Sequence, residues 1–124
     1  MSVAREQLEQ ARSLLNGDCG LSVDCLGRSV AILLRQSLAA AIAEYWVSTP
    51  WPTMQDARSR HQLVALPILW PGPRSLADEC RSDWYRLTSA CHGGTHALLP
   101  TPDEFAAMGD SIERFLDDPA APAR

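Results

Sequence analysis

Apolar residues recur every three or four positions along most of this 124-residue chain, which is the spacing of one face of an α-helix. Proline or glycine stands between the periodic segments and breaks them. Alanine, leucine and arginine, which favour helix over strand, are plentiful. We therefore predict an all-α fold without a strand longer than three residues. Four predicted helices cover about residues 2–15, 23–46, 53–66 and 75–91, and a fifth begins at Thr101.

The second predicted helix is the longest and the most apolar. Its main stripe runs from Leu26 to Tyr45, while Ile32 and Ala39 extend apolar surface around the back. A helix that is apolar on more than one face is central or lies in an interface. Because so short a chain cannot fully bury such a helix, we expect a homodimer in which the second and fourth helices pack near the two-fold axis.

The last three predicted helices share a start signal, a Ser or Thr followed three residues later by an acidic residue. The signals are Thr53 with Asp56, Ser75 with Asp78, and Thr101 with Glu104. The fifth has the most complete signal, with Thr101 as N-cap, Pro102 at the first helical position and Glu104 at the third. Short connections between long helices imply antiparallel neighbours, hence an up-and-down bundle of about five helices. Residues 1–118 are expected to form one domain and residues 119–124 a flexible tail.

Charge is unevenly distributed along the chain. Eleven basic residues, all arginine, oppose fifteen acidic ones, which gives a net charge of −4. A GC-rich genome explains the absence of lysine without any function, and phosphate recognition by the planar guanidinium is the functional alternative. Non-specific binding of nucleic acid requires net positive charge, so the chain is not a general polyanion binder. Only residues 51–100, with five arginines and four acids, could hold a local phosphate site.

The sequence also predicts where the protein resides. The N-terminus lacks the apolar region of a signal peptide. The longest uncharged stretch inside a predicted helix runs from Gln36 to Ala43, well short of the ~20 residues that a membrane span needs. We therefore expect a soluble cytoplasmic protein whose four cysteines stay reduced.

Four tryptophans fall at predicted helix ends and turns. In such places an indole ring usually closes the end of a hydrophobic core, and the alternative is stacking on a ligand. We favour the first interpretation for all four, which are Trp46, Trp51, Trp70 and Trp84.

Cysteine and histidine near the end of the fourth helix raise the question of zinc. Cys80, Cys91, His92 and His96 make four possible ligands. However, both cysteines fall on the apolar stripe, where free cysteine packs as a small hydrophobic side chain. They also lack the short Cys-x2–4-Cys spacing of a zinc knuckle. We expect neither bound metal nor any other cofactor.

The same segment carries a motif. Arg86 is followed, after five intervening residues, by His92, which fits the Arg-x4–6-His motif of HEPN domains. Residues 28–38 also resemble the long second helix of actinobacterial HEPN proteins, and the resemblance extends over most of residues 23–116. The motif is permissive, so helix number, helix order and motif position add to its weight. Further similarity lies at Trp84, Leu87, Cys91 and Pro100–Thr101.

The resemblance implies a HEPN-like bundle with metal-independent RNA cleavage, as in prokaryotic toxins and phage-defence ribonucleases. In such a site a histidine deprotonates the ribose 2′-OH or protonates the leaving oxygen, and an arginine holds the phosphate. These roles would fall on His92 and Arg86, with His96 as an auxiliary donor. The resemblance also implies an RNA substrate, a homodimer in which two motifs share one cleft, and an antitoxin or defence-system protein as partner.

The chain departs from the family pattern at two positions. Leu87 stands where active members carry a polar residue after the arginine, and Gly94 stands where related toxins carry tyrosine. Arg86 and His92 would also lie about 120° apart on an ideal helix, so the helix must end or distort for both to reach one phosphate. The alternative is a non-catalytic HEPN-like bundle that binds and regulates a partner protein or nucleotide, or a plain dimeric scaffold. Arg86 would then pair with Asp83, and His92 would cap the helix.

Overall fold

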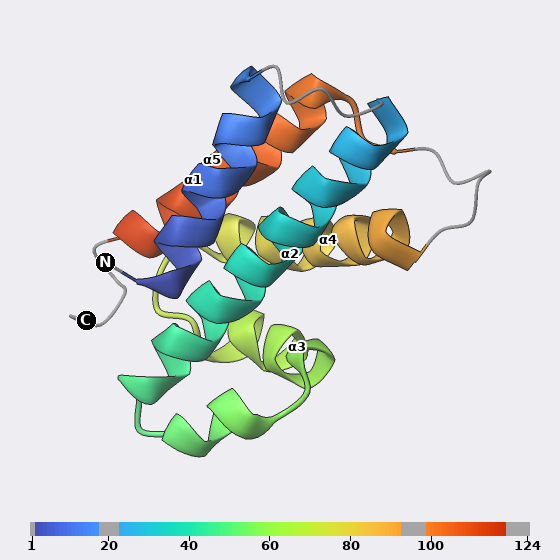
Figure 1. Cartoon of the computed structure of the whole chain (residues 1–124). Coiled ribbons are helices and arrows are strands. Elements are labelled where there is room, and N and C mark those ends of the chain that lie inside the picture. Colours follow the sequence, from blue (N-terminus) through green and yellow to red (C-terminus); the bar gives the residue numbers. More distant parts are fainter. Residues whose placement is uncertain (1, 18–22, 93–98, 119–124) are drawn as a thin grey trace.

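The computed structural model describes residues 2–17, 23–92 and 99–118, and these residues form a helical bundle without strands (Figure 1). The all-α prediction is confirmed, whereas the predicted tail at 119–124 lies outside the described residues. The elements are α1 (Val3–Asn16), α2 (Val23–Val47), the short 3-10 helix η1 (Pro52–Asp56), α3 (Ser59–Leu69), α4 (Arg74–His92) and α5 (Pro102–Asp117).

Helix α2 is the centre of the bundle, since α1, η1, α3, α4 and α5 all contact it. In Figure 1, α1 runs antiparallel to α2 and α5, and α4 crosses α2. The short elements η1 and α3 lie beside the C-terminal part of α2. The prediction that the second helix is central is therefore confirmed. The core contains large side chains from α2, α3, α4 and α5, among them Leu34, Leu38, Trp46, Leu63, Leu66, Leu87, Ile112 and Phe115.

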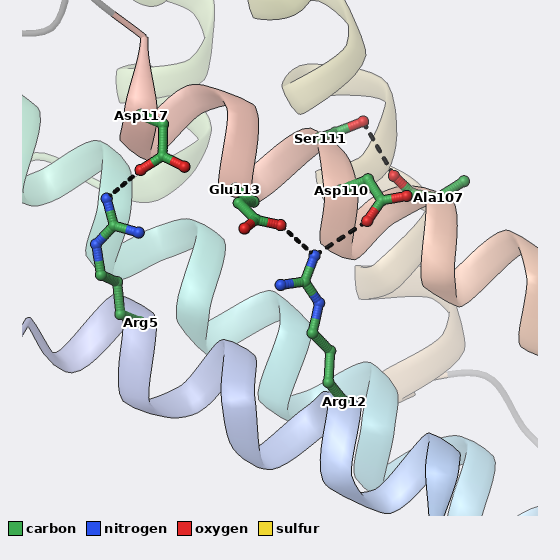
Figure 2. Close-up of polar contacts among 7 residues, drawn as sticks. All are labelled: Arg5, Arg12, Ala107, Asp110, Ser111, Glu113 and Asp117. Carbon is green, nitrogen blue, oxygen red and sulfur yellow. Dashed lines mark hydrogen bonds and ion pairs between the residues drawn. The ribbon is translucent and has the colours of Figure 1, made fainter.

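The seam between α1 and α5 is held by arginines of α1 and acidic residues of α5 (Figure 2). Arg5 pairs with Asp117, and Arg12 pairs with both Asp110 (3.0 Å) and Glu113 (2.7 Å). Since these side chains are partly exposed, each pair contributes little to stability. Their main consequence is electrostatic, because much of the acidic charge of α5 faces arginines of the same chain.

The predicted start of α5 is confirmed in atomic detail. The Thr101 hydroxyl accepts from the Glu104 backbone N–H (3.2 Å), and the Glu104 carboxylate accepts from the Thr101 backbone N–H (3.0 Å). These reciprocal bonds satisfy two donors that a helix start leaves unpaired. Both bonds lie within four residues of sequence, which is why the sequence predicts them.

The predicted third helix over 53–66 is wrong at its start. Residues 52–56 form η1 instead, and α3 begins only at Ser59, after extended backbone at Ala57 and Arg58. The buried Gln62 amide stabilises this break by donating to the carbonyls of Ala57 (2.7 Å) and Gln55 (3.2 Å). Thr53 therefore caps no α-helix.

Proline does not end α3 where we predicted. The helix continues through Pro67 to Leu69. Proline cannot donate the backbone hydrogen bond to the carbonyl four residues earlier, so α3 lacks this one bond and runs only two residues further.

The predicted cap at Ser75 is also wrong, because α4 begins one residue earlier, at Arg74. The Pro73 carbonyl accepts from the Leu76 backbone N–H (3.1 Å), so the first turn closes before Ser75 can serve as a cap. Pro73 has the fixed φ angle that suits the beginning of a helix, which favours this earlier start.

Three of the four tryptophans close the core as predicted. Trp46, Trp70 and Trp84 are buried. The Trp70 ring stacks on Phe115, with 4.7 Å between centroids, and meets Tyr45 edge-on at 4.9 Å. Trp51 is the exception, since 46% of it is exposed. The prediction is therefore wrong for Trp51.

Within the described residues, the segment Cys25–Val47 is long and apolar enough to cross a membrane, judged by length and composition alone. The helix that contains it packs against α1, α4 and α5. It also carries Arg28, Arg35 and Glu44. These features are compatible with a soluble protein, and the cytoplasmic location stays a prediction.

Candidate functional site

The two motif residues lie on one uninterrupted helix. Helix α4 contains Arg86 and ends at His92, so no distortion separates them. Six residues of helix place the two side chains about 120° apart and ~9 Å apart along the axis. Both residues are exposed, and no hydrogen bond or ion pair joins them. The third predicted site residue, His96, lies outside the described residues.

Arg86 points toward α5, where its guanidinium pairs with Glu104. The alternative interpretation predicted Asp83 as the ion-pair partner, and the structure has Glu104 instead. Glu104 is also the capping-box residue of α5, and the Thr101 backbone N–H and Arg86 together lower the pKa of its carboxyl group. The arginine of the motif thus takes part in the contact between two helices.

A groove of about 340 Å³ lies between α4 and α5 at this contact. Besides Arg86 and Glu104, it is lined by Glu79, Asp83 and Arg114. Arg114 bonds to Glu79 at 2.6 Å. Burial and the nearby charge of Glu79 raise the pKa of Asp83 to about 6, although Arg86 and Arg114 oppose the rise.

The raised pKa of Asp83 predicts a pH-dependent stability. Between about pH 4 and 6 the native state holds a proton that the unfolded state has lost, so this group lowers stability as pH rises through that interval. Asp83→Asn should therefore raise the melting temperature at pH 7, and the gain should vanish below pH 4. Thermal unfolding of both proteins across this range tests it. An equal gain at pH 4 and pH 7 would contradict it.

His92 lies on a different side of α4 from Arg86. Residues 81, 85, 88 and 92 follow the spacing of one helical face. Thr88 belongs to this face, and its hydroxyl accepts a hydrogen bond from the Nε of Arg35 in α2 (3.2 Å). The Arg35 guanidinium also lies over the Trp84 ring, 4.6 Å from its centroid. Thr88 is one helical turn before His92, so Arg35 lies on the side of α4 that His92 shares.

Seven of the eleven arginines fall into two groups by position and pairing. Four of them form ion pairs with acidic side chains where α5 contacts α1 or α4. These are Arg5, Arg12, Arg86 and Arg114. In contrast, no ion pair with another described residue is found for the three arginines of the α2–α4 face. The charge distribution of the sequence pointed only to residues 51–100 for a phosphate site, so two of these arginines were missed, although a spacing of seven residues within α2 could have indicated them. The three are Arg28, Arg35 and Arg81.

The cysteines of α4 have the environment of core side chains. Burial, followed by the charges of Asp83 and Glu79, raises the pKa of the Cys80 thiol to about 12. Burial also raises the pKa of Cys91, although the charge of Arg35 opposes it. Zinc binds the thiolate form, which both environments disfavour. In residues 2–17, 23–92 and 99–118, no group of three or more potential ligands could hold a metal ion.

Comparisons with known proteins gave no match. The chain is matched by no protein-family model, no curated protein and no solved structure. The resemblance to HEPN domains therefore depends on the motif and the helix order of this sequence.

Proposed function

We propose that this chain is a metal-independent, RNA-cleaving protein of HEPN type in which His92 transfers the proton. The observation that supports this is an exposed histidine at the end of α4 with Arg35 on the same side of the helix, where this arginine has no ion pair with any described residue. Histidine titrates near neutral pH, so it can act as a base or an acid in the cell. A toxin or phage-defence role, with an antitoxin or defence-system partner, follows from the resemblance.

The proposed reaction takes its nucleophile from the substrate. His92 removes the proton of a ribose 2′-OH, and the oxygen attacks the adjacent phosphorus. The bond to the 5′ oxygen breaks, and that oxygen takes up a proton from a second acid. The products are a 2′,3′-cyclic phosphate and a 5′-OH end. Arginine stabilises the negative charge that collects on the phosphate, so the reaction needs no metal.

The proposal includes a homodimer. Ile32 on α2 and Tyr85 on α4 are large apolar side chains that are 44% and 43% exposed. A symmetric contact between copies of α2 and α4 would cover them. It would also bring two copies of His92 together, and the second copy could supply the acid that the reaction needs.

Cleavage of a mixed-sequence RNA by the purified protein tests the proposal. We expect products that end in a 2′,3′-cyclic phosphate, and the same rate in the presence of a chelator. A DNA strand of the same sequence should stay intact, because it lacks the 2′-OH. RNA that stays intact, or cleavage that the chelator abolishes, would contradict the proposal.

A non-catalytic bundle that binds and regulates a partner is the second candidate, and two observations favour it. The motif arginine, Arg86, is already paired with Glu104 of α5. Val64 and Ile68 are also exposed one turn apart on α3, and 77% of Ile68 is accessible. If RNA stays intact in the assay above, this candidate replaces the ribonuclease.

A further inference from the structure

Arg35 is held in place by two neighbours on α4. Its guanidinium lies over the buried ring of Trp84, and its Nε donates to the Thr88 hydroxyl. The Trp84 ring covers one face of the guanidinium, and the bond to Thr88 uses its Nε. The two terminal nitrogens have no hydrogen-bond or ion-pair partner among the described residues. Arg35 is therefore a fixed cation with both terminal nitrogens left to bind another molecule.

Such an arrangement suits a phosphate. The terminal nitrogens of a guanidinium match two phosphate oxygens in a bidentate contact. Stacking on an aromatic ring and a bonded Nε reduce the side-chain freedom that binding would otherwise remove. The partly buried position also weakens screening by salt, which strengthens attraction to an anion.

We infer that Arg35, rather than the motif residue Arg86, binds the RNA phosphate that lies next to His92. The inference deepens the proposed function and rests on it for the identity of the substrate. Arg28 lies two helical turns before Arg35 on α2, on the same side, and is also unpaired within the described part of the chain. It is placed to attract a neighbouring phosphate of the same strand.

Arg86 is less suited to this role for two reasons. Its guanidinium already pairs with Glu104, which offsets part of its charge, and this carboxylate would repel a phosphate bound beside it. It also lies on the α5 side of α4, about 120° around the helix from His92. Arg35, in contrast, is held by Thr88, one turn before His92.

Binding of an uncleavable 2′-O-methyl RNA oligonucleotide, measured by fluorescence anisotropy at fixed salt, tests the inference. Arg35→Gln should weaken binding roughly 10–100-fold, the loss expected for a charged hydrogen bond. It should also reduce the slope of log affinity against log salt by about 1. Arg35→Lys should restore little, since lysine lacks the bidentate fork. The matched control is Arg114→Gln, which removes an arginine paired with Glu79 on the α5 side and should bind as wild type does.

A second variant separates binding from folding. Thr88→Val keeps the shape and the charge but removes the bond that orients Arg35, and it should weaken binding several-fold. If Arg35→Gln unfolds, as circular dichroism would reveal, the Thr88→Val result decides the matter alone. Normal binding by Thr88→Val would then overturn the inference.

The outcomes distinguish this inference from the proposed function. Arg35-dependent binding by a protein that cleaves no RNA would support Arg35 and defeat the ribonuclease. Cleavage or binding that is unchanged in a folded Arg35→Gln protein would overturn the inference and leave the ribonuclease standing. Equal losses of binding in Arg86→Gln and Arg35→Gln, or no binding by wild type, would also overturn it.

Discussion

His92→Ala is expected to lower the rate of RNA cleavage by ~10²–10⁴-fold, the usual cost of losing a positioned proton-transfer group. The side chain is exposed at the last residue of α4. It has no hydrogen bond or ion pair with other described residues. Its removal should therefore leave circular dichroism and melting temperature nearly unchanged, so that a loss of cleavage reports on chemistry. Initial rates on one RNA substrate provide the measurement.

The chain offers a matched control for this variant. His61 is also an exposed histidine, but it lies on α3 instead of α4. His61→Ala should cleave RNA at the wild-type rate. Cleavage that survives His92→Ala would exclude His92 as the proton-transfer group, and the proposed mechanism would fail with it.

The sequence predicted best those features that depend on nearby residues. The capping box of Thr101 and Glu104 needs only its own four residues, and it is present as expected. The start of α3 was mispredicted because a buried side chain, Gln62, supplies bonds to backbone carbonyls five and seven residues before it. Local signals at Thr53 could not reveal that competition.

The candidate site depends on contacts that sequence spacing does not contain. Arg86 and His92 are close in sequence, yet a continuous helix turns them to different sides. The partner of Arg86 comes from α5, and the contacts of Arg35 come from a helix about fifty residues further along. Only the packing of α2, α4 and α5 decides which arginine lies on the same side as the histidine.

Phe115→Ala is the variant for which we expect the largest loss of stability, about 3–5 kcal/mol, as for other large aromatic side chains removed from a core. Phe115 is fully buried and stacks on Trp70, which in turn meets Tyr45. The indole N–H groups of Trp46 and Trp70 are buried without a hydrogen-bond partner in the described structure. Apart from one long hydrogen bond, from the Tyr45 hydroxyl to the Leu69 carbonyl (3.4 Å), apolar packing holds this cluster together, and no polar bond would offset an empty space at Phe115.

Urea unfolding followed by circular dichroism measures this loss in the free energy of unfolding. Ile68→Ala, on the exposed surface of α3, is the control, and it should change the free energy of unfolding by about 0.5 kcal/mol or less. The aromatic cluster includes the C-terminal end of α2, while Arg35 lies near the middle of the same helix. Because the cluster anchors this helix, the Phe115→Ala protein should lose RNA binding only as it unfolds. A loss of stability below 1 kcal/mol would show that α2 and α5 are held together elsewhere.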